Sequence, residues 1–200
     1  MSTIVAPPLN VLAVAGSLKE HSVTRVVMRW LAAELEDTGC SVDVLDLRAE
    51  NLPLFNPDNY RELPAYPQLQ QRVHKADVIL LGSPDYHGSI GGAVKNFLDY
   101  YWQEFAGKLF VPVVASHEKG LTVIDQIRTV ARQCYAWTLP YGVSFAEKTD
   151  VAEGQIINAT LRQRLSMLAR DSRIYGTLLA CQRQADLTGK EVCFMAKHRA

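Results

Sequence analysis

The chain has 200 residues, 48% of them hydrophobic, which is enough to bury the core of one compact domain. Lys plus Arg and Asp plus Glu both total 21, so no overall basic field is available to attract nucleic acid or an anionic membrane surface. We therefore expect a single domain over 1–200, with a flexible N-terminus at 1–8, a weakly patterned C-terminal tail from about 180 to 200, and no nucleic-acid partner.

Targeting signals and cysteines point to a reducing compartment. The first residues lack the charged and apolar regions of a secretory signal, and no later stretch approaches the roughly 20 apolar residues that cross a bilayer. The 4 cysteines form no C-x-x-C pair and are expected to be small buried hydrophobic residues; they are Cys40, Cys134, Cys181 and Cys193. We expect a cytoplasmic protein with no membrane partner.

Apolar runs and helical repeats alternate along the chain. Short apolar runs predict strands at 9–15, at 42–45, at 78–81, at 109–115 and at 141–145. Helical spacing predicts helices over 23–35, 68–76, 90–101, 122–136 and from 156 to about 179, and residues 51–66 read as a long surface loop. Apolar strands that alternate with helices indicate a five-stranded parallel sheet with helices on both faces, a doubly wound α/β fold of strand order 2-1-3-4-5.

In such a sheet, ligands bind outside the carboxyl ends of the strands where the strand order reverses, so the loops after the first and third strands should face each other. The first loop, from Gly16 to Arg25, matches neither G-x-G-x-x-G nor the lysine-containing P-loop. Its hydroxyls at Ser17, Ser22 and Thr24 stand where a helix begins, and together they could enclose one terminal phosphate. The alternative that Ser22 is only a helix cap and Ser17 only a turn residue stays open.

The second loop, from Ser83 to Gly92, holds three glycines and a proline where a plain strand-to-helix turn needs fewer. Pro84 and Tyr86 can offer an apolar face to a flat aromatic ring, while the glycine-rich backbone offers N–H donors to its polar edge. An elaborate turn without a ligand is the other interpretation.

The two loops together resemble those of the NAD(P)H-dependent FMN reductase family, whose members share G-S-x-R-x-x-S and P-E-Y-N-G-S-x-P-G motifs. The likeness runs from about Leu9 to about Ala180. It implies a flavodoxin-like fold, FMN as cofactor and NADPH or NADH as co-substrate. By matching position, the resemblance implies three groups of cofactor-binding residues: Ser17, Lys19, Ser22, Val23 and Thr24 around the phosphate, Pro84, Asp85, Tyr86, His87 and Gly88 along the ring and ribityl chain, and Ser116 and His117 at a third wall.

The chain departs from the family pattern at three places. Lys19 stands where arginine is usual, which keeps the charge but loses the planar fork that grips phosphate. His87 replaces the usual asparagine and Gly91 the usual proline. The loop over 116–120 lacks the Gly-Gly pairs often found there, which leaves the third wall the least defined part of the site.

The resemblance implies hydride transfer from NAD(P)H through FMN to a small-molecule acceptor such as free flavin, a quinone, an azo compound or chromate. No catalytic side chain is required, because the cofactor performs the difficult step. A non-catalytic electron-transfer or flavin-sensing protein is the alternative, but such flavodoxins are usually acidic whereas this chain is neutral. An assembly module that kept only the fold is disfavoured by the intact hydroxyls of the first loop.

Two other kinds of site have weaker support. Asp85, His87 and Ser89 include the residue types of a hydrolase triad, but neighbours on one turn rarely converge and the G-x-S-x-G elbow is absent. The 5 histidines show no metal-binding spacing, so no metal site is expected.

Assembly is expected from the helix that follows the second loop. Lys95 and Asp99 lie four residues apart on one face, and in the resembling family a lysine and an aspartate at the matching positions pair across subunits. Tyr100, Tyr101 and Trp102 would supply aromatic contacts beside that pair. We expect a homodimer or homotetramer, with a solvated pair on a monomer as the alternative.

Overall fold

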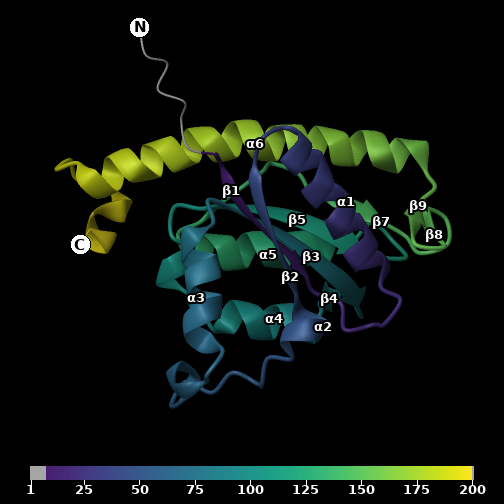
Figure 1. The fold of residues 1–200 in the computed structure, drawn as a ribbon, viewed down its shortest axis with the longest axis horizontal. Coiled ribbons are helices and arrows are strands. Elements are labelled where there is room, and N and C mark those ends of the chain that lie inside the picture. Colours follow the sequence, from purple (N-terminus) through teal and green to yellow (C-terminus); the bar gives the residue numbers. More distant parts are fainter. Residues whose placement is uncertain (1–7, 200) are drawn as a thin grey trace, which may run out of the picture.

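The computed structural model describes residues 8–199, and the flexible N-terminus expected over 1–8 lies outside them except for Pro8. The central sheet consists of β1 (Asn10–Ala15), β2 (Ser41–Asp46), β3 (Val78–Tyr86), β4 (Ser89–Ile90), β5 (Leu109–Ala115), β6 (Trp137–Thr138) and β7 (Val143–Phe145), and β8 (Val151–Ala152) pairs with β9 (Gln155–Ile156) in a separate hairpin. The helices are α1 (Val23–Asp37), α2 (Leu47–Glu50), α3 (Tyr66–Lys75), α4 (Gly92–Asp99), α5 (Leu121–Gln133) and α6 (Ala159–Thr188), with short 3-10 turns η1 (Tyr60–Glu62), η2 (Gln103–Phe105) and η3 (Phe194–His198). This is the expected α/β fold, with helices above and below the strands (Figure 1).

The sheet follows the order β2-β1-β3-β5-β6, and its long strands are parallel. The simple order 2-1-3-4-5 is therefore not confirmed. Two short segments make the difference: β4 pairs with β3 in an antiparallel turn, and the edge beside β5 is shared by β6 and β7. Pro140 separates β6 from β7, because a proline has no N–H to donate to a ladder, and the strand expected at 141–145 is found as β7 over Val143–Phe145.

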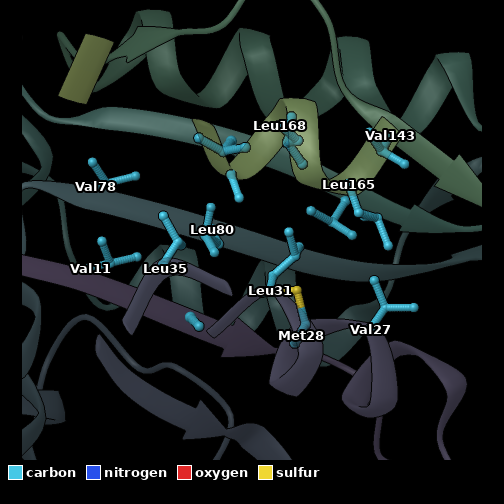
Figure 2. Close-up of a cluster of buried hydrophobic side chains, with 14 of the residues drawn as sticks. Val11, Val27, Met28, Leu31, Leu35, Val78, Leu80, Val143, Leu165 and Leu168 are labelled. Carbon is cyan, nitrogen blue, oxygen red and sulfur yellow. The ribbon is translucent and has the colours of Figure 1, made fainter. Parts of the chain in front are cut away.

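One face of the sheet is covered by α1 and α6. Met28 and Leu31 of α1 meet Leu165 and Leu168 of α6 above the strands, and all four side chains are fully buried (Figure 2). The spacing of three residues within each pair belongs to the amphipathic helical repeat. The contact fixes α1 firmly, and α1 begins directly at the first loop.

The opposite face is covered by α3, α4 and α5, and its core includes a group of aromatic rings. Tyr100 and Tyr101 belong to this core and are each only 3% exposed, while Trp102 is 58% exposed. The expectation that all three aromatics are available at a subunit surface is therefore wrong for the two tyrosines. Phe55 and Tyr60 from the long loop cover Tyr100, with ring centroids 5.4 and 6.1 Å away. Distant segments thus bury residues that helical spacing alone leaves outside.

The C-terminal segment is more ordered than expected. Helix α6 ends at Thr188 and not near Leu179, because no glycine or proline interrupts the chain after Gly176 until Gly189. Arg183 on this extension donates to Asp77 at 2.8 Å, and the side chain of Met195 beyond it is buried. Together these contacts hold the region that was predicted as a weakly patterned tail against the end of the sheet.

The structure also bears on the cysteines and on membrane-spanning helices. Cys40 and Cys134 are buried as expected, whereas Cys181 is exposed and Cys193 is half-buried. Within residues 8–199, none of the helices is both long and apolar enough to span a bilayer.

Candidate functional site

The loops after β1, β3, β5 and β7 meet at the carboxyl edge of the sheet and enclose a cavity of about 150 Å³. It is lined by Ser17, Lys19, Ser22, Val23, Thr24, Pro84, Asp85, Tyr86, Ala115, Ser116, His117 and Glu147. His87 and Gly88 are the two cofactor-binding candidates that do not line it. They line an adjoining, more open cavity of about 780 Å³ that shares Asp85, Ser116 and His117 with the first. The structure therefore brings all the candidates to one place, as a small polar end and a wider outer part.

The small end offers buried hydroxyl groups. Ser17, Ser22 and Thr24 are only 5%, 4% and 1% exposed. Ser22 is indeed the N-cap of α1, because its oxygen accepts a hydrogen bond from the Arg25 N–H at 3.2 Å. This uses an oxygen lone pair and leaves the O–H free. Among the described residues, none of the three hydroxyls donates to another protein group, so three donors remain for a ligand beside the positive end of α1.

Side chains from α1, β2 and α2 hold the first loop in this shape. Arg25 pairs with Asp46 at 2.6 Å and donates to the carbonyl of Glu20 at 2.8 Å. Arg48 donates to the carbonyl of Leu18 at 2.6 Å. The turn itself requires glycine at position 16, since a side chain there would collide with the neighbouring helix and strand. The loop is therefore preorganised around its three hydroxyls.

The second loop is a two-residue β-hairpin between β3 and β4. Asp85 pairs with Ile90 and Tyr86 with Ser89, leaving His87 and Gly88 at the turn. Both turn residues have positive φ, 58° for His87 and 75° for Gly88, which is the signature of a type I′ turn. Asn-Gly is the preferred pair in such turns, which gives a physical reason for the asparagine that family members carry where this chain has His87.

Hydrogen bonds to Gln126 and Ser116 fix this hairpin relative to the rest of the site. Gln126 of α5 accepts hydrogen bonds from the Ser89 hydroxyl at 3.1 Å and from the Ile90 N–H at 2.9 Å. Asp85 accepts from the Ser116 hydroxyl at 2.8 Å and from the Gly88 N–H at 2.8 Å. Sequence reasoning missed Gln126, since nothing in a helix pattern marks one exposed polar position as the partner of a loop.

Glu147 is the second residue that sequence reasoning missed. It follows β7 and forms an ion pair with Lys19, with both carboxylate oxygens near the ammonium at 2.8 and 3.0 Å. The hydrogen bond from Lys19 lowers the pKa of the Glu147 carboxyl below its usual range. A signal existed, because residues that directly follow a buried parallel strand lie at this same edge, and the rule applies to the last strand as well as to the others.

The arrangement does not resemble a hydrolase or metal centre. Asp85 accepts from Ser116 instead of orienting His87, and the Ser89 hydroxyl donates to Gln126 instead of to His87, so the arrangement of a triad is not formed. The described part of the chain contains no group of three or more His, Cys, Asp or Glu residues positioned to hold a metal ion.

The family described as NADPH-dependent FMN reductase matches residues 9–150 of this chain. The chain is 30% identical over 187 residues to an NADH-dependent FMN reductase of Pseudomonas putida, covering 90% of this chain and 100% of the relative. It is 29% identical over 177 residues to an FMN reductase (NADPH) of Pseudomonas aeruginosa, covering 84% and 94% of the two chains. Among solved structures, the NAD(P)H:(acceptor) oxidoreductase FerB of Paracoccus denitrificans shares the fold with a TM-score of 0.70 at 17% identity, covering 85% and 98%. The chain therefore belongs to the NADPH-dependent FMN reductase family.

Proposed function

We propose that this protein transfers hydride from NADH or NADPH through bound FMN to a small-molecule acceptor. Membership of the FMN reductase family supports the reaction class. Free flavin, a quinone, an azo compound and chromate are the acceptor classes that fit a flavin carrier open to solvent. A cytoplasmic location remains a prediction from the sequence.

The observation that carries the proposal is the pairing of a small donor-rich cavity with an open one. Three buried hydroxyls at the start of α1 suit the terminal phosphate of FMN, which is dianionic at neutral pH. The ring would extend along Pro84 and Tyr86, and Tyr86 is 55% exposed. In the adjoining space of about 780 Å³ there is room for a nicotinamide and an acceptor to approach in turn.

Within this proposal, the chain's own groups bind and orient. When bound, FMN would supply the hydride-accepting ring. The Asp85 carboxylate is held by Ser116 and by the Gly88 N–H, which keeps the hairpin closed beside the site. No side-chain nucleophile is needed.

The direct test is anaerobic mixing of the FMN-loaded protein with NADH or NADPH. We expect the flavin absorption near about 450 nm to bleach within about a second, because an enzyme of this class turns over at least that fast. Steady-state rates with a nicotinamide and a quinone should give parallel double-reciprocal lines, since both substrates visit one flavin face in turn. A flavin that stays oxidised with both nicotinamides would favour the non-catalytic electron-transfer alternative instead.

We also propose that the protein assembles through the face of α4 that carries Lys95 and Asp99. Within one chain these side chains already form an exposed ion pair, with Nζ to Oδ1 at 2.5 Å. Exposed pairs of this kind contribute little to the stability of a monomer, so both groups are available to a partner at small cost. The neighbouring Trp102 adds an exposed apolar surface, and its burial by a second copy would be favourable.

The change Lys95→Glu tests this assembly. We expect it to weaken the dimer or tetramer at least severalfold, because it places a carboxylate against Asp99 of the partner copy. The double change Lys95→Asp with Asp99→Lys should restore the assembly, since it inverts the pair without creating like charges. Light scattering at micromolar concentration measures the mass. A monomeric unmodified protein would contradict the assembly, and an unchanged mass for Lys95→Glu would remove the ion pair from it.

A further inference from the structure

Glu147 places a negative charge at the small polar end of the site. Its side chain is one of those that line the cavity of about 150 Å³, beside Ser17, Ser22 and Thr24. The cavity is also lined by His117 and by Asp85, whose carboxylate accepts hydrogen bonds from the Ser116 hydroxyl and the Gly88 N–H. The Glu147 carboxylate would therefore repel a phosphate bound at these hydroxyls, and unlike the Asp85 carboxylate it is paired with Lys19.

The same carboxylate is paired with the ammonium of Lys19, the group that a phosphate at this site would contact. Lys19 donates to both oxygens of Glu147, at 2.8 and 3.0 Å, in the way an ammonium contacts two phosphate oxygens. Both side chains are well exposed, 53% for Lys19 and 39% for Glu147, so the pair is solvated and costs little to open. Lys148 and His117 also lie near enough to favour the charged form of Glu147, which keeps the carboxylate ionised at neutral pH.

The segment that carries Glu147 is held in place by contacts of neighbouring residues and not by the Glu147 side chain. Asp150 accepts the N–H of Ala146 at 2.8 Å and the amide of Asn158 at 2.6 Å, which ties both ends of the segment that includes the β8–β9 hairpin. The only side-chain hydrogen-bond partner of Glu147 among the described residues is Lys19. The carboxylate can thus turn away without breaking the contacts that hold the segment.

We propose that the Glu147 carboxylate competes with the cofactor phosphate for Lys19. The carboxylate pairs with Lys19 in the absence of FMN and must release it for FMN to bind. This proposal rests on the proposed function, because it takes the phosphate of FMN to lie at Ser17, Ser22 and Thr24. Because the FMN phosphate must displace the Glu147 carboxylate from Lys19, the affinity for FMN is lowered. The affinity for a flavin without a phosphate is unaffected. Glu147 thereby sets the difference in affinity between FMN and riboflavin.

Fluorescence titration of the cofactor-free protein with FMN and with riboflavin tests this role. We expect Glu147→Gln to bind FMN about fivefold more tightly, because the neutral amide does not repel the phosphate and bonds the lysine more weakly than a carboxylate does. Riboflavin affinity should stay the same, and the gain should shrink at high salt because the interaction lies at the surface. Glu153→Gln is the matched control, since Glu153 lines the neighbouring cavity of about 690 Å³ and not this one. It should change neither affinity.

The variant Lys19→Met separates the exchange from simple repulsion. Without the ammonium nothing keeps the carboxylate at the phosphate site, so Glu147→Gln should bring little further gain in the Lys19→Met protein. A gain of full size in that background would overturn the exchange, as would an unchanged FMN affinity in the single variant or an equal tightening of riboflavin. These titrations contain no NAD(P)H, so they can fail while flavin reduction succeeds. A protein that binds no FMN at all would instead refute the proposed function.

Discussion

Replacing Ser17 with aspartate is expected to weaken FMN binding by roughly 100-fold or more. Ser17 is only 5% exposed and shares the small cavity with Ser22 and Thr24. A carboxylate at this position would face the cofactor phosphate at close range, where two like charges near a protein surface repel by several kcal/mol. The Lys19 N–H already donates to the Ser17 hydroxyl at 3.3 Å, so it could stabilise the new carboxylate in the empty loop and oppose the phosphate further.

The neutral variant Ser17→Asn is the matched control for size. It adds nearly the same volume without charge, so it should lose much less affinity than Ser17→Asp when both are titrated with FMN by fluorescence. Riboflavin, which has no phosphate, should bind the two variants equally. Equal FMN affinity in the aspartate variant and the unmodified protein would mean that the phosphate lies elsewhere.

Replacing Lys108 with methionine is expected to lower the free energy of unfolding by about 3 kcal/mol. Lys108 is only 1% exposed, and its ammonium donates to the carbonyls of Val73 at 2.8 Å, of His74 at 2.7 Å and of Ala76. These carbonyls belong to the last turn of α3, which has no further helical N–H to bond them. Methionine would keep the packing volume but leave the carbonyls buried without a donor.

Denaturant titration at pH 7 measures this effect. Lys75→Met, at an exposed position of α3, should change stability by no more than about 0.5 kcal/mol.

Burial, with a smaller contribution from Arg183, lowers the pKa of Lys108 to about 7. Lysines of the unfolded chain titrate at about 10.4. Between pH 7 and that value Lys108 is protonated in the unfolded chain but largely neutral in the folded protein, so the free energy of unfolding rises with pH in that range. The rise between pH 7 and 9 should be smaller in Lys108→Met. A variant as stable as the unmodified protein, with the same pH slope, would contradict this role for Lys108.

The sequence by itself determined the fold class and the edge of the sheet where the site lies. The run at 109–115 coincides with β5, and the helical repeat after Ser22 coincides with the start of α1. Such patterns are local, since a strand buried on both faces must be apolar throughout and a covered helix must show the three-and-four repeat. The carboxyl-edge rule then placed the loops at Ser17 and Ser83 together, because parallel topology leaves little freedom in where those loops end.

Only the tertiary structure decided which side chains far apart in the chain meet. Helical spacing leaves Tyr100 at the surface, but Phe55 and Tyr60 cover it. The extension of α6 past Leu179 places Arg183 against Asp77, a contact that no local pattern predicts. Gln126 reaches the site from a helix position with no sequence signature, and the position of Glu147 after a strand predicts the edge at which it lies but not its pairing with Lys19. Their roles depend on distances between elements, and hydrophobic periodicity reports which face of an element is buried but not which neighbour covers it.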